Sequence, residues 1–374
     1  MDKLFLIDAY ALIYRSYYAF INNPRINSKG LNTSAVMGFC NTLNEVLNKE
    51  QPSHIGVAFD HGLTFRNEAF PQYKAQREAT PEDIKRSVPI IKDILTAYHI
   101  PVLQVDGFEA DDVIGTLALK AGEQGVDTYM LTPDKDYAQL VRPNVWMYRP
   151  RHGGGYETMG PDEVNQKYNI SSPLQVIDLL ALMGDSADNF PGCPGVGEKT
   201  ASKLINEFGT VEKLLENTAQ LKGKMREKVE GAVEDIKMSK FLATIRTDVP
   251  VELDLEQLQL KEPDATKLQE IFTELEFKSF ANRLLNKAEK PKKEQVVVNF
   301  VPEEPKYELD DIILSHGVRD DILDVADYAR NSKIVFEQWG LGKTHKYSKR
   351  MGINLYGPPG TGKTMAAHAI AKYL

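Results

Sequence analysis

Short apolar runs alternate with longer helical patterns through the first half of the chain, and this alternation constrains its fold more than any other feature. Runs typical of buried strands occur at residues 4–7, 55–59, 101–105 and 128–131. Helical periodicity occurs near residues 34–48, 81–98 and 110–123. Strands and helices in this alternation build βα units around a mostly parallel sheet. The sequence therefore predicts an α/β domain in which helices flank the sheet.

The pattern changes after a hairpin-like stretch at residues 145–159, whose tip carries three glycines at 153–155. From about residue 161 to residue 285, short helical patterns are separated by glycine and proline signals. We therefore expect a helical domain or arm after the sheet domain.

A second change of composition marks the C-terminal part. Residues 287–306 are rich in Lys, Glu and Pro and can bury little apolar surface unless 296–300 docks as a strand. Beyond them, a helical pattern near 318–336 and a strand-like run at 353–356 begin a new segment. We predict four parts: a sheet domain (1–172), a helical domain (173–286), a linker (287–306) and a C-terminal segment (307–374).

Composition limits the classes of partner. The 374 residues include 45 Lys and Arg against 53 Asp and Glu, a formal net charge of −8. This charge argues against a polyanionic partner unless the acids gather where metal ions neutralise them. The two cysteines, Cys40 and Cys193, form no metal-binding motif and favour a reducing compartment. Because Asp8 interrupts the first apolar run and no run could span a membrane, we expect a soluble cytoplasmic protein without a membrane partner.

Carboxylates follow all four predicted strands. They are Asp8 after the first, Asp60 after the second, Glu109, Asp111 and Asp112 after the third, and Asp134 and Asp136 after the fourth. In a parallel sheet these positions share the carboxyl-terminal edge, where open α/β folds bind ligands. Two further acids, Asp185 and Asp188, follow the apolar helical segment 172–183, where the chain could return to that edge.

So many carboxylates in one crevice would repel each other and raise each other's pKa unless cations were bound. Mg²⁺ prefers oxygen ligands, and two such ions roughly 4 Å apart can activate a water and stabilise the leaving oxygen of a phosphoryl displacement. Taken singly, Asp111 and Asp112 could be helix caps, and Asp134 and Asp136 could be turn formers. Taken together, the acids favour a metal centre because every predicted strand ends in at least one of them.

Five segments carry a specific family resemblance. They read FLIDAYALIYRSYYAF, VAFDHGLTFRNEAFPQYKAQR, VDGFEADDVIGTLA, LTPDKDYAQLV and MGDSADNFPGCPGVGEKTASKLI. In order and spacing they resemble the 5' nuclease domain of bacterial DNA polymerase I and its flap endonuclease relatives, over about residues 1–287. The resemblance implies a PIN-like fold with a helix-hairpin-helix (helix-three-turn-helix) DNA-binding subdomain. It also implies a structure-selective 5'-3' exonuclease or 5' flap endonuclease of replication and repair.

The same resemblance implies two divalent ions, Mg²⁺ or Mn²⁺, because all nine family carboxylate positions are matched. The acids of the first three strands would lie nearer one ion, and Asp134, Asp136, Asp185 and Asp188 nearer the other. The implied partner is DNA with a 5' flap, a nick or a primer; protein partners are not predicted.

Other elements must hold the DNA, since acids repel its phosphates. Tyr73, Lys74 and Arg77 have near-helical spacing, and the resemblance places them in an arch where Tyr73 stacks on a base and the two cations steady the scissile phosphate. A solvated helix face is the alternative. The cluster Lys222, Lys224, Arg226 and Lys228 lies among glutamates, and we interpret it as such a face.

The segment 192–203, GCPGVGEKTASK, places glycines before a helix, where backbone N–H groups can approach a phosphate. It resembles the family's helix-hairpin-helix, which grips the duplex backbone, often with a monovalent cation such as K⁺. We predict phosphate contacts at Gly195, Gly197, Lys199 and Thr200. Cys193 stands where the family commonly has another small or aliphatic residue.

GPPGTGKT at residues 357–364 is a phosphate-binding loop, with Gly357, Gly362, Lys363 and Thr364 as its predicted nucleotide contacts. Residues 307–374 resemble the start of an AAA-type ATPase, a partial P-loop segment without an acidic Walker B strand, so we expect at most weak ATP binding and no ATPase activity. A fusion, a rearrangement and a truncation all fit this sequence. Besides the nuclease, the alternatives are an ATP-dependent remodelling protein, a PIN-type ribonuclease and a catalytically silent DNA-binding protein.

Overall fold

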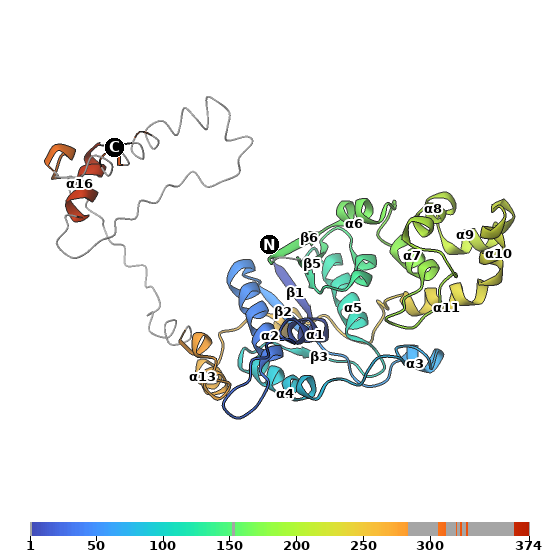
Figure 1. The fold of residues 1–374 in the computed structure, drawn as a ribbon, viewed down its shortest axis with the longest axis horizontal. Helices are drawn as coiled ribbons and strands as arrows, with labels where there is room; N and C mark the ends of the chain where they lie inside the picture. Colours follow the sequence, from blue (N-terminus) through green and yellow to red (C-terminus); the bar gives the residue numbers. More distant parts are fainter. Residues whose placement is uncertain are drawn as a thin grey trace. The chain divides into compact units, whose positions relative to one another are not determined.

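The computed structural model describes residues 2–151, 154–282, 306–311 and 363–373, together with positions 319, 322, 323 and 327. It divides into two units, Met1–Pro291 and Lys292–Leu374 (Figure 1). The predicted linker strand at 296–300 and the strand-like run at 353–356 lie outside the described residues, as does most of the helical pattern at 318–336.

A six-stranded sheet forms the centre of the first unit, in the order β3-β2-β1-β4-β5-β6. The strands are β1 (Lys3–Asp8), β2 (His54–Ala58), β3 (Val102–Leu103), β4 (Asp127–Leu131), β5 (Val145–Pro150) and β6 (Tyr156–Met159). The first five are parallel, and β6 pairs with β5 antiparallel. The predicted mostly parallel sheet and the hairpin after it are confirmed.

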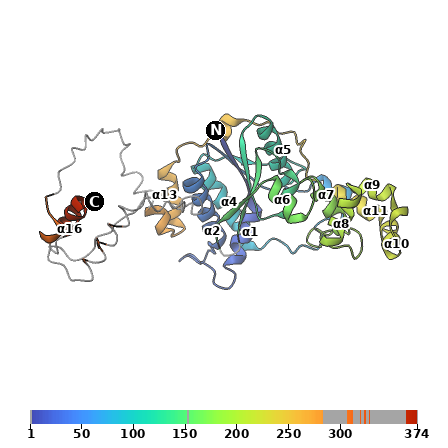
Figure 2. The same ribbon diagram turned by 90° about the horizontal axis from the view of Figure 1, so that it is seen from above.

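Helices cover both faces of this sheet. Side chains alternate along β1, and its apolar residues therefore contribute to a core on each face. Leu4 and Leu6 join the core that includes α5, whereas Phe5 and Ile7 join the core that includes α1, α2, α4 and α13 (Figure 2). The helices of this part are α1 (Ala9–Ala19), α2 (Ser34–Glu45), η1 (Val46–Glu50), α3 (Phe65–Ala69), α4 (Glu82–Ala97), α5 (Ala110–Glu123) and η2 (Lys135–Leu140).

The predicted helical arm follows β6. It contains α6 (Pro161–Tyr168), α7 (Gln175–Met183), α8 (Glu198–Phe208), α9 (Val211–Glu216), η3 (Thr218–Gln220), α10 (Lys224–Gly231) and α11 (Val233–Ala243). The chain then returns to the sheet, where the Leu260 N–H donates to the Ser53 carbonyl over 2.9 Å. Two last helices, α12 (Leu255–Leu258) and α13 (Ala265–Glu274), pack against β2 and α4. Residues 244–282 therefore belong with the sheet in the structure, whereas the predicted helical domain includes them and extends to 286.

In the second unit, the described elements are η4 (Leu309–Asp311) and α16 (Lys363–Tyr373). The Lys372 ammonium lies 2.7 Å from the Glu308 carboxylate. Lys363 and Thr364 begin α16, whereas Gly357 and Gly362 lie outside the described residues. Among the helices that the structure describes, none is long and apolar enough to cross a membrane.

Candidate active site

One cavity of about 810 Å³ opens at the carboxyl-terminal edge of the sheet. Seven of the nine predicted acids line it: Asp8, Asp60, Glu109, Asp111, Asp134, Asp136 and Asp188. Of the other two, Asp112 is fully buried behind the wall, and Asp185 pairs with Lys135, its carboxylate 2.7 Å from the ammonium. The structure thus brings together acids that are up to 180 residues apart in the sequence.

Helix starts fix the acids of the cavity. Asp8 ends β1 and caps α1, where its carboxylate accepts a hydrogen bond from the Ala11 N–H over 3.0 Å. Asp60 accepts one from the Ala110 N–H over 2.8 Å at the start of α5. Asp134 caps η2 by accepting from the Asp136 N–H over 3.0 Å. A carboxylate that caps a helix in this way can still bind a metal ion, since the cap uses only one of its oxygens.

Burial and mutual repulsion disfavour the charged form of these acids. Burial, together with Asp60 and Asp134, raises the pKa of Asp8 to about 7. Burial also raises the pKa of Asp60 and Asp134, and it places the pKa of Asp111 and Asp136 well above the ordinary range. One oxygen each of Asp111 and Asp136 is buried without a hydrogen-bond partner in the described structure. Orphaned buried carboxylate oxygens are suited to bind a hard divalent cation.

Two groups of acids could each hold an ion. Asp60, Glu109 and Asp111 come from the ends of β2 and the start of α5, and ligand atoms of Glu109, Asp111 and Asp112 lie within 4.8 Å of one another. Asp134, Asp136 and Asp188 line the cavity from η2 and the loop after α7. We call these the first and second acid groups.

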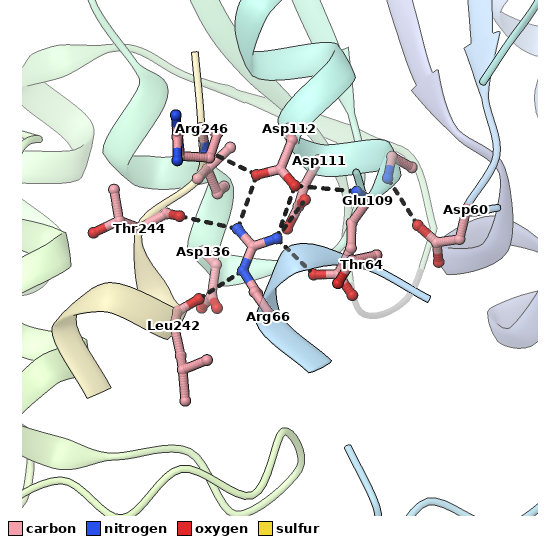
Figure 3. Close-up of polar contacts among 12 residues, drawn as sticks. Asp60, Thr64, Arg66, Glu109, Asp111, Asp112, Asp136, Leu242, Thr244 and Arg246 are labelled. Carbon is pink, nitrogen blue, oxygen red and sulfur yellow. Dashed lines mark hydrogen bonds and ion pairs between the residues drawn. The ribbon is translucent and has the colours of Figure 1, made fainter. Parts of the chain in front are cut away.

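Asp112 differs from the acids that line the cavity because its side chain is fully buried, and both of its oxygens already have donors (Figure 3). The Arg66 guanidinium donates to them over 2.7 and 2.8 Å, and the Glu109 and Arg246 N–H groups donate over 3.1 and 2.8 Å. These contacts are those of a side chain that orients its neighbours, and a metal-binding role for Asp112 stays a prediction.

The predicted arch segment is a run of turns in this structure, not a helix. Lys74 has a φ of +56°, and its N–H donates to the Asp188 carbonyl over 2.9 Å. Its ammonium lies 2.5 Å from Glu109 and 3.8 Å from Asp188, and Arg77 also pairs with Asp188. Burial alone would raise the pKa of Glu109, but Lys74 and Arg66 outweigh it and hold that pKa below its usual range.

Tyr73 is placed differently from the expectation. Its side chain is only 4% exposed, and its hydroxyl donates to Glu109 over 2.9 Å and to Asp188 over 3.3 Å. A ring buried in this way presents no face for stacking on a base. In this structure Tyr73 instead connects an acid of the first group with one of the second.

The glycine segment forms a tight loop before α8. A Cβ atom on Gly192 would lie 2.2 Å from the Gly184 nitrogen, so the two backbone stretches meet only because this position has no side chain. Gly195 has a φ of +73° and lies against Lys228, whereas Gly197 caps α8 with open space around it. Gly195, Gly197 and Lys199 are exposed and Thr200 is half-buried, so the N-terminal amides of α8 face solvent.

Several cavity residues escaped the sequence analysis. Tyr10, Tyr14 and Tyr18 of α1 line it, with successive ring centroids 6.3 Å apart and Tyr18 53% exposed. Their spacing of four residues was the available signal, because such residues share one face of a helix. Arg66 also lines the cavity, and no local sequence pattern predicts that an arginine is fully buried.

The pKa of Asp8 gives a first prediction. The folded state keeps a proton on Asp8 up to about pH 7, whereas the unfolded chain releases it near the ordinary value of 3.8. The unfolded state therefore binds fewer protons in this window, and the free energy of unfolding should fall as the pH rises through it. Thermal unfolding of the metal-free protein should show a lower midpoint at about pH 8 than at about pH 5. Millimolar Mg²⁺ should raise the midpoint more at the higher pH, and an equal effect at both would contradict this assignment.

Comparison with protein families assigns most of the first unit. Residues 3–169 match the 5'-3' exonuclease, N-terminal resolvase-like domain, and residues 171–266 match the 5'-3' exonuclease, C-terminal SAM fold. Residues 353–374 match the ATPase family associated with various cellular activities, over that short stretch alone.

Among curated proteins, DNA polymerase I of Bacillus caldotenax is 42% identical over 297 residues, 78% of this chain and 33% of that protein. The chain spans about a third of the length of this and the next DNA polymerase I relatives. The 5'-3' exonuclease of Aquifex aeolicus is 38% identical over 280 residues, 75% of this chain and 94% of that protein.

Solved structures show the same fold at low identity. The T5 D15 protein co-crystallized with metal ions has a TM-score of 0.56 at 19% identity, covering 77% of this chain and all of that one. The catalytic core of Rad2 in complex with DNA substrate has a TM-score of 0.54 at 17% identity, covering 76% of this chain and 91% of that one. With the two domain matches and the relative covered almost completely, these findings show that the chain belongs to the 5'-3' exonuclease family.

Proposed function

We propose that this chain is a divalent-metal-dependent nuclease that hydrolyses DNA as a 5'-3' exonuclease and 5' flap endonuclease. The observation that carries the proposal is the cavity with seven converging carboxylates, two of which keep a buried oxygen without a hydrogen-bond partner in the described structure. Charge of this kind is stable only when cations are bound, and paired cations on oxygen ligands are suited to phosphodiester hydrolysis. Family membership supports this reaction over nucleotide-driven remodelling.

The acids would hold two Mg²⁺ or Mn²⁺ ions. Asp60, Glu109 and Asp111 would hold one, and Asp134, Asp136 and Asp188 the other, with Asp8 between the groups and Asp185 oriented by Lys135. When bound, such a pair supplies an activated water and stabilises the leaving oxygen.

The chain's own residues would position the substrate. Lys74 and Arg77 line the cavity and would receive the scissile phosphate in exchange for their contacts with Glu109 and Asp188. The water would attack on the side that leaves the 3' oxygen, so the products carry 5' phosphates. Tyr14 and Tyr18 provide aromatic faces beside the cavity for unpaired bases.

The exposed start of α8 would hold the duplex. Backbone N–H groups at Gly195, Gly197 and Lys199 would contact its phosphates, with K⁺ as the proposed bridging ion. Thr200 would contribute through its hydroxyl, because its N–H donates to the Gly197 carbonyl over 3.0 Å. We therefore propose a sheet domain for catalysis and a helical domain for DNA, with residues 244–282 of the predicted helical domain (173–286) packed against the sheet domain (1–172). DNA with a 5' flap, a nick or a primer is the proposed substrate. The proposed location of the protein is the cytoplasm, because its two free cysteines favour a reducing compartment.

The open space at Gly197 allows a clean test of this interface. A Cβ atom there meets no protein atom within 4 Å, so Gly197→Val combined with Lys199→Ala should keep the fold while it blocks a phosphate. We expect weaker duplex binding with a shallower salt dependence, because a backbone phosphate contact is lost. Cleavage of short single strands should change less. Fluorescence anisotropy with a labelled duplex over a salt series measures both effects.

Gly231→Val combined with Lys237→Ala is the matched control, since Gly231 also has open space around it and Lys237 is an exposed residue of the same arm. Equal duplex affinity in the wild type and the Gly197 variant would reject the predicted interface.

Substrate choice distinguishes the proposed function from a PIN-type ribonuclease. Matched substrates, a 5'-flapped DNA duplex and a single-stranded RNA of the flap sequence, should be incubated with Mn²⁺ and the purified chain. We expect cleavage near the flap junction and little cleavage of the RNA. Preferred cleavage of the RNA would replace the proposal with the ribonuclease.

A further inference from the structure

A five-residue segment fastens the helical arm to the acids. We call residues 242–246 the junction: they end α11, the last helix of the arm, and begin the return to the sheet. Two buried side chains hold the junction from opposite sides, Arg66 of α3 at 1% exposure and Gln139 of η2 at 2%. Neither residue was expected from the sequence, and neither has a part in the proposed reaction.

Arg66 connects the junction with the first acid group (Figure 3). Its guanidinium donates to the Leu242 and Thr244 carbonyls, each over 2.9 Å. The same group donates to Glu109 over 2.9 Å and grips both oxygens of Asp112. A further hydrogen bond joins the junction to the same acids, because the Arg246 N–H donates to Asp112 over 2.8 Å.

Gln139 makes the corresponding connection with the second acid group. Its amide donates to the Ala243 carbonyl over 2.9 Å and accepts from the Ile245 N–H over 2.9 Å. It also donates to the Asp136 carbonyl over 3.0 Å, within the short helix that carries Asp134 and Asp136. We call these two sets of contacts the clamps: Arg66 with Asp112 on one side of the junction, and Gln139 on the other. Junction residues alternate between them, since 242, 244 and 246 bond to the first clamp and 243 and 245 bond to the second.

These clamps are rigid for chemical reasons. A buried guanidinium persists only when its donors are matched, and its planar fork fits two carboxylate oxygens at once. A lysine offers three donors without that plane, so it cannot satisfy two carbonyls and two carboxylates together. A displaced junction would leave buried polar groups unpaired, so the arm and the acids should move as one body.

We propose that Arg66 and Gln139 are positioning residues, and that the junction couples the placement of the helical arm to the geometry of both acid groups. This inference rests on the proposed function, because it gives the arm's grip on DNA a direct mechanical link to the site of cleavage. Without it, the arm would be a passive attachment.

Two variants test the coupling in the full chain, Arg66→Lys and Gln139→Met. Mn²⁺ affinity is measured by isothermal titration calorimetry without DNA, and amide exchange of 242–246 is measured with and without Mn²⁺. Each variant should bind Mn²⁺ roughly ten- to a hundredfold more weakly, the usual cost of removing a residue that orients metal ligands. Mn²⁺ should slow amide exchange in the junction of the wild type and do so much less in the variants.

Arg142→Lys and Gln175→Met are the matched controls. Arg142 donates to the Leu140 carbonyl over 3.1 Å, and Gln175 bridges the Ser171 N–H and the Gly209 carbonyl, each over 2.9 Å. Each control therefore loses side-chain bonds to the backbone away from the junction, and neither should change Mn²⁺ affinity by more than about twofold.

Wild-type Mn²⁺ affinity and an unchanged Mn²⁺ effect on exchange in Gln139→Met would overturn the proposal, and they would do so even if Arg66→Lys failed to fold. A weakening of equal size in Gln175→Met would also overturn it, because the loss would then be general. If the wild type shows the Mn²⁺ effect on junction exchange yet cleaves no flap, the proposed function is rejected. The proposed coupling between the junction and the acid groups is then still supported.

Discussion

Asp136→Ala is expected to lower the rate of flap cleavage by roughly a thousandfold, or about 4 kcal/mol of transition-state stabilisation. One Asp136 oxygen is buried without a hydrogen-bond partner among the described residues, and burial together with Asp134 places the pKa of Asp136 well above the ordinary range. Removing this carboxylate should misplace an ion while it relieves repulsion, so the metal-free variant should unfold at a higher temperature than the wild type. Single-turnover cleavage and thermal unfolding measure the two effects.

Asp60→Ala should lose a similar factor in rate with little change in thermal stability. Here the relief of repulsion is offset by loss of the hydrogen bond from the Ala110 N–H to Asp60. Asp162→Ala, which removes an exposed acid from the first turn of α6, is the control. Wild-type turnover in Asp136→Ala or Asp60→Ala would reject the assignment of the cavity as the active site.

Lys74→Met is expected to reduce single-turnover cleavage by roughly a hundredfold at saturating Mn²⁺, because it removes a fixed cation from the place of the scissile phosphate. Its ammonium lines the cavity and contacts acids of both groups, Glu109 at 2.5 Å and Asp188 at 3.8 Å. Arg77→Met should cost less, since the Arg77 side chain is 53% exposed and water screens its charge.

Lys267→Met is the control for Lys74→Met, because Lys267 is exposed on α13 beside Glu270. A cleavage rate for Lys74→Met within twofold of that control would mean that the cation is a structural partner of Glu109 and takes no part in the reaction.

The sequence predicted the parts of this site that depend on local pattern. Alternation of strands and helices put acids at the ends of β1, β2 and β4, and the helix expected at 110–123 is α5. Helix α1 was missed, although Asp8 caps it, because its run of tyrosines was assigned no element. Strand β3 is only Val102–Leu103, shorter than the apolar run that predicted it.

The remaining features depend on contacts between distant residues. Tyr73 was expected to stack on a base in an arch but is buried, with Glu109 and Asp188 both accepting from its hydroxyl. Asp112 belongs to the acid-rich pattern, yet Arg66, 46 residues away, occupies both its oxygens. The return of residues 244–282 to the sheet follows from packing of α13 on α4, which no local periodicity records.

The most direct test of the central claim follows one labelled flap duplex through cleavage by the purified chain, with Mg²⁺ and with excess chelator. With Mg²⁺, the account predicts cleavage near the flap junction, with a 5' phosphate on the strand that remains in the duplex. With chelator, it predicts no product, and restored Mg²⁺ should restore cleavage. Full cleavage in chelator, or products that carry a 5' hydroxyl, would contradict the two-metal site built by the carboxylates of this cavity.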